Sequence, residues 1–226
     1  MIEAYDPAAF PPLGVTVDLV LMTIRDSRLA VLLQHRDEEP YKGKWALPGG
    51  FVREDEGFDA AAQRILADKA GLPGAWLEQL YSFGDPGRDP RMRIVTIAYF
   101  ALLPVGDLAA ALSGRDDLIL APLDALPVLA FDHAGIVDHA AERLRGKLDY
   151  APVAFALLPP RFTLRALQDV HEAILGIRLN KPAFRRRMLD KGWIEGTGEK
   201  ETGGAFRPAE LFGVNPDLAG FGTGPS

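Results

Sequence analysis

The sequence contains no cysteine, which excludes disulfide bonds and cysteine-based zinc sites. It also lacks any apolar run close to the roughly 20 residues that span a bilayer. Residues 1–14 carry acids where a signal peptide needs positive charge, and they include no apolar core. These absences predict a cytoplasmic protein with no membrane partner.

Acidic residues outnumber basic ones by 31 to 25, and the net charge of −6 gives no hint of a nucleic-acid partner. The acidic excess is confined to residues 1–160, with 15 Lys and Arg against 23 Asp and Glu. Residues 161–226 have 10 basic and 8 acidic residues, and segment 178–191 has six basic side chains and one acid. That segment is either a solvated helix face or a surface for an anionic partner.

The length of 226 residues allows one large domain or two small ones. We predict an N-terminal arm at 1–13, a first domain at 14–150, a linker at 151–160 and a second domain at 161–226. In the first domain, apolar runs predict strands at 15–24, 29–34, 77–83 and 93–103, the first two joined as a hairpin, and helices at 58–70 and 133–148. This mixture predicts an α+β domain with a mainly β core.

The second domain has a different pattern. Thr163 is a plausible N-cap for a helix that ends at Gly176, and Asn180 is placed to cap a basic helix reaching about Lys191. Two short strands are expected at 193–195 and 206–207, joined by a glycine-rich turn. Two helices followed by a β-hairpin is the order of a winged helix-turn-helix, which binds DNA.

Residues 50–72 have the spacing of a known motif but lack most of its carboxylates. Gly50, Glu56, Arg64 and the Gly71-Leu72 pair resemble the skeleton of the Nudix box, and so does the surrounding WALPGGFV. The resemblance implies a Nudix-type sandwich of mixed sheet and helices, in which helical carboxylates hold Mg²⁺ or Mn²⁺. Here the ligand positions are occupied by Ile65, Asp68 and Lys69, which make a poor site for a hard cation. We therefore expect no catalytic residues, no metal and no hydrolysis.

The diphosphate pocket is nevertheless expected to remain. The candidate effector-binding residues lie on or near the elements that form a Nudix pocket: Arg36, Lys44, Gly49, Gly50, Arg53, Glu56 and Arg64. An ion pair with Glu56 that supports the fold explains Arg64 at least as well as contact with the ligand does. Tyr41, Trp45 and Phe51 offer rings for adenine, although the last two stand in an apolar stretch typical of a core. The four histidines show no metal-ligand spacing and are interpreted as packing or surface residues.

The basic helix supplies the candidate DNA contacts. On a helical wheel Phe184, Met188 and Leu189 mark the buried side, which leaves Arg186 and Arg187 exposed and Arg185 beside the domain surface. Lys181 lies near the helix start, where base contacts are made. In the wing, Lys200 stands between Glu199 and Glu201, and Arg207 is the better candidate. The predicted set is Lys181, Arg185, Arg186, Arg187, Lys200 and Arg207.

Together these features resemble one family, the Nudix-related transcriptional regulators of NAD metabolism called NrtR. The matching stretches are KGKWALPGGFV, FTLRALQDVHEAILG, NKPAFRRRMLDKGWIE and RPAELF. The family implies a homodimeric repressor of NAD-cofactor genes that binds an inverted-repeat DNA operator. It also implies that the effector is ADP-ribose or a related nucleotide and that no cofactor is required. Relatives with this layout control other pathways, including sugar use.

Two other hypotheses remain. In the first, the chain is a metal-dependent hydrolase of the ADP-ribose pyrophosphatase type with an accessory domain. The remaining carboxylates of Glu56 and Asp68 support this hypothesis. Alternatively, the second domain is a winged helix that binds protein, against which the basic run at 185–187 counts.

Overall fold

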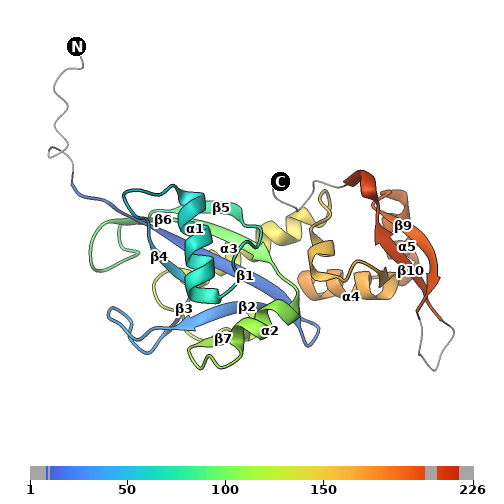
Figure 1. Cartoon of the computed structure of the whole chain (residues 1–226), viewed down its shortest axis with the longest axis horizontal. Coiled ribbons are helices and arrows are strands. Elements are labelled where there is room, and N and C mark those ends of the chain that lie inside the picture. The colour runs from blue at the N-terminus through green and yellow to red at the C-terminus, as the bar shows by residue number, and fades with distance from the viewer. Residues whose placement is uncertain (1–8, 10, 202–207, 219–226) are drawn as a thin grey trace, which may run out of the picture.

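A computed structural model describes residues 9, 11–201 and 208–218 (Figure 1). The first domain is built on the predicted hairpin, with β1 at Gly14–Arg25 and β2 at Arg28–His35. Asp26 and Ser27 both have positive φ, at 51° and 59°, which is the conformation of a two-residue turn that matches the twist of the strands.

The hairpin is part of a seven-stranded mixed sheet with the central order β3-β2-β1-β6-β5. Strand β1 pairs parallel with β6 (Ile94–Leu102) and antiparallel with β4 (Gly49–Phe51). Strand β2 pairs with β3 (Trp45–Ala46) and with β7 (Leu118–Pro122), and β5 (Glu78–Phe83) completes the far edge. Strand β1 therefore lies between β2 and β6, in the middle of the sheet.

The side chains of β1 alternate between two apolar cores. Val17, Leu19 and Leu21 pack with α1 (Phe58–Ile65) and α2 (Val105–Leu112) on one face of the sheet. Val20 and Met22 pack with α3 (His133–Lys147) on the other. Figure 1 shows α1 and α3 on opposite sides of the sheet. Because both faces are covered, the strand is mostly apolar, and Asp18 is its one buried charged side chain.

The helix predicted at 58–70 is not regular throughout. Helix α1 ends at Ile65, and residues Leu66–Ala70 form a wider π turn before Gly71 closes it at φ 66°. In a π turn the side chains no longer recur at the spacing of a regular α-helix, and Asp68 and Lys69 belong to this turn whereas Ile65 belongs to α1. Sequence reasoning also missed α2 and β7.

The second domain has the predicted order. A 3-10 segment at Val153–Leu157 leads into β8 (Phe162–Thr163), α4 (Leu164–Leu175), α5 (Lys181–Asp190), β9 (Ile194–Lys200) and β10 (Glu210–Val214). Both predicted caps form: Thr163 Oγ1 accepts from the Ala166 amide at 3.1 Å, and Asn180 Oδ1 from the Ala183 amide at 3.0 Å. The strand expected at 206–207 lies outside the described residues, and β9 pairs with β10 instead.

The two domains share one apolar core. The cluster beneath α3 continues into the second domain through Phe162, Ile174 and Phe212. Predicted linker residues take part, because Ala154 is buried and the Phe155 ring lies 5.5 Å from that of Phe162. Among the described residues, no helix is long and apolar enough to cross a membrane.

Candidate functional site: a polar cavity and a basic helix

A cavity of about 330 Å³ opens between β1, β4, the loop after β2 and the start of α3. Of the predicted effector-binding residues, Arg36, Gly49 and Gly50 line it, whereas Lys44, Arg53, Glu56 and Arg64 lie outside its lining. Three more cationic side chains line it, Lys69, Arg88 and Arg91, together with the acidic side chains of Asp18, Asp37, Glu38 and Asp89. The lining is polar and carries charges of both signs, and Arg36, Lys69 and Arg91 are the side chains that suit an anionic group of a ligand.

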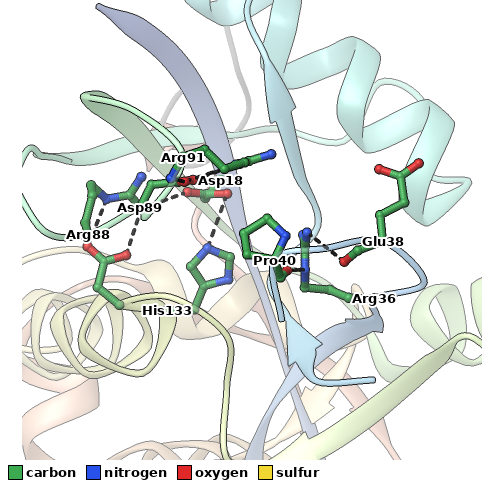
Figure 2. Close-up of polar contacts among 9 residues, drawn as sticks. Asp18, Arg36, Glu38, Pro40, Arg88, Asp89, Arg91 and His133 are labelled. Atoms are coloured by element: carbon green, nitrogen blue, oxygen red, sulfur yellow. Dashed lines mark hydrogen bonds and ion pairs between the residues drawn. The ribbon is translucent and has the colours of Figure 1, made fainter. Parts of the chain in front are cut away.

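Arg36 is held by the loop that follows β2. Its Nε donates to the Pro40 carbonyl at 2.9 Å, and a terminal nitrogen donates to the Glu38 carbonyl at 3.3 Å (Figure 2). The guanidinium also lies 4.9 Å from the centre of the Phe131 ring. These contacts fix the side chain at one wall of the cavity.

Glu56 and Arg64 form the ion pair that the sequence left as an alternative. Arg64 Nε lies 2.9 Å from Glu56 Oε2, a second Arg64 nitrogen contacts Oε1, and the same side chain donates to the Phe51 carbonyl at 3.0 Å. Glu56 also accepts from the Arg53 amide at 2.9 Å. The hydrogen bond from Arg64 lowers the pKa of Glu56 to about 2. The pair ties β4 to α1 beside the cavity.

Gly49 is required by close packing. A Cβ at this position would stand 2.2 Å from Asp18 Oδ1 and 2.9 Å from the Val17 carbonyl oxygen. At Gly50 a Cβ would meet only Ile65, at 3.5 Å, which is an ordinary contact. Gly49 therefore lets β4 approach the carboxylate of Asp18 directly.

Sequence reasoning missed a buried polar network at the base of the cavity. Arg88, 7% exposed, donates to both carboxylate oxygens of Asp132 at 2.9 and 2.7 Å and lies 3.5 Å from Asp18 Oδ2. His133 accepts from the Leu47 amide through Nδ1 at 2.9 Å, and its Nε2 lies 3.7 Å from Asp18 Oδ1. Figure 2 shows this group across the cavity from Arg36. The available signal was Asp18, a single charge within an apolar strand.

Aromatic rings surround the mouth of the cavity. The Tyr41 and Phe131 rings meet edge to face at 4.8 Å, and Arg91 lies over Phe51 and Phe131 at 5.5 and 5.7 Å. Tyr41 and Phe51 are 40% and 47% exposed, so the prediction of Phe51 as a core residue is wrong. Such rings offer a stacking surface for a planar base.

The three positions that resemble metal-ligand positions have separate environments. Ile65 is buried against Gly50, Asp68 is exposed, and Lys69 lines the cavity. In the described part of the chain, no group of three or more His, Cys, Asp or Glu is arranged to hold a metal ion.

Helix α5 presents its basic residues outward. Phe184 and Met188 are buried, but Leu189 is 41% exposed, so its prediction as a core residue is wrong. The basic side chains are all exposed: Lys181, Arg185, Arg186 and Arg187. Arg185 lies 3.9 Å from Glu210 on β10, and Arg187 lies 3.8 Å from Asp149. Within the described ranges, Lys181 and Arg186 have no ion-pair partner.

In the wing, which includes β9 and β10, an ion pair partly neutralises the acidic side chains beside Lys200. Lys200 is exposed at the end of β9, and the neighbouring Glu199 forms an ion pair with Arg161. Arg161, which sequence reasoning did not include, therefore offsets one of the two acids beside Lys200. Arg207 lies outside the described residues.

The fold and site define a class: a Nudix-type domain with a polar, charged cavity, joined through a shared core to a winged helix with an exposed basic helix. Residues 12–140 match the Nudix domain family, and residues 154–214 match the NrtR DNA-binding winged helix domain. The chain belongs to the NrtR family of Nudix-related transcriptional regulators, which confirms the resemblance seen in the sequence.

Individual relatives match most of the chain. The ADPR responsive transcriptional repressor NtrR of Acinetobacter baylyi is 39% identical over 92% of this chain and 84% of its own length. Shewanella oneidensis NrtR complexed with a 27mer DNA is 38% identical with TM-score 0.79, covering 92% of this chain and 96% of that one. The Nudix domain of the same protein, complexed with ADP ribose, is 37% identical with TM-score 0.52, covering 62% and 94%.

Proposed function

We propose that this chain is a transcriptional repressor that binds operator DNA through its winged helix and responds to ADP-ribose through the cavity of its Nudix domain. The observation that carries the proposal is similarity along 92% of the chain to a protein solved on DNA. The exposed basic α5 and the arginine and lysine side chains that line the cavity supply the matching chemistry. The family resemblance adds that the regulated genes serve NAD metabolism.

The cavity is proposed to bind a diphosphate without metal and without hydrolysing it. Ile65 has no atom that can bind a metal ion, and Glu56 is already paired with Arg64. The positive charge of Lys69 in the cavity lining would repel a metal cation. These residues do not fit Mg²⁺. Lys69 and Arg36 instead supply the positive charge that a metal would bring to the phosphates.

Of the predicted effector residues, we assign ligand contact to Arg36, Gly49 and Gly50, with Lys69 and Arg91 added. Arg53, Glu56 and Arg64 hold the segment between β4 and α1 in place. Lys44 supports the Arg36 loop, since its carbonyl accepts from the Arg36 amide at 2.9 Å.

The assembly is proposed to be a cytoplasmic homodimer on an inverted-repeat operator, because one winged helix makes too few contacts for tight specific binding. The proposed division of the chain remains an arm at 1–13, domains at 14–150 and 161–226, and a connection at 151–160.

Calorimetry with ADP-ribose in EDTA tests metal-free binding. We expect saturable binding at a stoichiometry of one per chain. Binding that disappears on chelation and returns with Mg²⁺ would show that a cation is held after all.

An activity assay separates the regulator from the pyrophosphatase alternative. With ADP-ribose and excess Mg²⁺ or Mn²⁺ we expect no appreciable turnover. Rates within the usual enzyme range of about 1–10³ s⁻¹ would favour the hydrolase.

A further inference from the structure

The base of the cavity holds a carboxylate whose hydrogen bonds are incomplete. Asp18 is 6% exposed, yet its two partners, Arg88 and His133, lie at 3.5 and 3.7 Å. Within the described part of the chain, Oδ1 accepts no hydrogen bond. Among the described residues, only Thr23 Oγ1 is both fully enclosed and without a partner, so Asp18 Oδ1 keeps access to the cavity, where the hydroxyl of a ligand can reach it.

We propose that Asp18 binds vicinal sugar hydroxyls at the base of the cavity and so distinguishes a nucleotide that carries a second, terminal sugar from one that ends in phosphate. This inference rests on the proposed function and specifies which part of the ligand meets which wall. Adjacent hydroxyls supply two O–H donors on one side of a sugar, and a carboxylate has two oxygens to accept them.

The neighbouring groups suit a hydroxyl better than a cation or a phosphate. His133 Nδ1 accepts from the Leu47 amide, so its proton lies on Nε2, which faces Asp18. Burial lowers the pKa of His133 and keeps the ring neutral. A hydroxyl that donates to Asp18 can therefore accept from the Nε2 hydrogen, whereas the charges of Asp18 and Arg88 repel phosphate and metal respectively.

Burial also sets the direction of the ligand. The rings that suit a base are exposed, because Phe51 lines the cavity at 47% exposure and Tyr41 packs on the lining residue Phe131 at 40% exposure, whereas Asp18 is nearly covered. The cations Arg36, Lys69 and Arg91 line the walls without belonging to the Asp18 network. A ligand with a base at one end, a diphosphate in the middle and a sugar at the other end matches this order when the sugar is innermost.

The test compares ADP-ribose with ADP on the full chain by calorimetry, using Asp18→Asn. The variant keeps the shape and removes the charge. We expect it to weaken ADP-ribose binding by about tenfold or more and to leave ADP affinity unchanged. Asp124→Asn is the matched control, since Asp124 is exposed, pairs with Arg28 and lies outside the lining. Equal effects on both ligands, or none on ADP-ribose, would overturn the proposal.

A second measurement needs no variant. Wild-type protein is titrated with an ADP-ribose analogue that lacks one hydroxyl of the terminal sugar. We expect about tenfold weaker binding than for ADP-ribose, and equal affinity would overturn the role of Asp18 while leaving the proposed function intact. If wild-type protein binds no ADP-ribose at all, the proposed function itself fails, so the two failures are distinguishable.

Discussion

At the scale of single residues, Gly49 and Asp18 leave no room for another atom between them. Gly49→Ala would place a Cβ 2.2 Å from Asp18 Oδ1 and force β4 or the carboxylate to move. We expect a loss of about 1–3 kcal/mol in the free energy of unfolding, together with weaker ADP-ribose binding. Gly50→Ala, one residue along the same strand, would meet only an ordinary contact with Ile65, so it is the matched control for the unfolding measurement. Equal behaviour of the two variants in urea unfolding would show that the close approach is unimportant.

Also at the residue scale, the Glu56–Arg64 pair predicts a pH dependence. The pKa of Glu56 falls from an ordinary value of 4.5 to about 2 in the folded chain. A lowered carboxyl pKa stabilises the fold above the unfolded-state pKa, and this contribution is lost as pH falls from about 4.5 to about 2. We expect Glu56→Gln to be less stable than wild type at neutral pH, with a difference that shrinks across this window. Unfolding measured at a series of pH values checks it, and a difference independent of pH would contradict it.

At the scale of elements, α5 is proposed to carry DNA affinity. Arg186 is exposed and has no ion-pair partner among the described residues, so Arg186→Ala removes a cation without breaking an internal contact. We expect weaker operator binding and a salt dependence that flattens by up to about one unit of slope. Arg165→Ala on α4 is the matched control, because Arg165 is exposed and pairs with Asp169. If both variants bind DNA like wild type across a salt series, recognition lies elsewhere.

Lys181, at the start of α5, has a different expected effect. A side chain that reaches a base edge affects one operator position, so Lys181→Ala should relax specificity there at a cost of about 1–3 kcal/mol. Binding to a set of single-base operator variants measures it. A uniform loss across the set would instead indicate a phosphate contact.

The elements that could be predicted from the sequence are those whose ends are set by residues a few positions away. The caps at Thr163 and Asn180 and the left-handed ends at Gly71 and Gly176 act within a few residues, and each was visible in the sequence. The π turn after Ile65 was not, because a turn of this kind leaves no clear periodic pattern. Helix α2 and strand β7 are short and depend on packing against the sheet for their stability.

Apart from Arg36, the lining of the cavity was predicted only where a motif is continuous. Gly49 and Gly50 lie within one stretch and were identified together. Asp18, Arg88 and His133 come from three distant segments that only the fold brings into contact. For Arg64 and Glu56 the motif indicated that the two residues lie close together. Only the structure shows that they form an ion pair with each other.

At the scale of the whole molecule, the shared core predicts that the two domains unfold together. Ile174 on α4 is fully buried in the cluster that includes Ile136 and Leu144 of α3, and its carbonyl accepts from Arg145 at 3.1 Å. We expect Ile174→Ala to cost about 2–5 kcal/mol and to lower the unfolding midpoint of both domains alike. Two variants report the two midpoints by fluorescence. One keeps Trp45 of the first domain as its single tryptophan, and the other keeps Trp193 of the second. Separate transitions would contradict a single cooperative unit.

The central claim is that a nucleotide in the Nudix cavity controls DNA binding by the winged helix. Fluorescence anisotropy measures it directly, with a labelled duplex from the region upstream of the chain's own gene, titrated in EDTA with and without ADP-ribose. We expect specific binding whose affinity changes about 5-fold or more when ADP-ribose is present, within the usual range of allosteric coupling. DNA binding that is indifferent to saturating ADP-ribose, or no DNA binding at all, would contradict it.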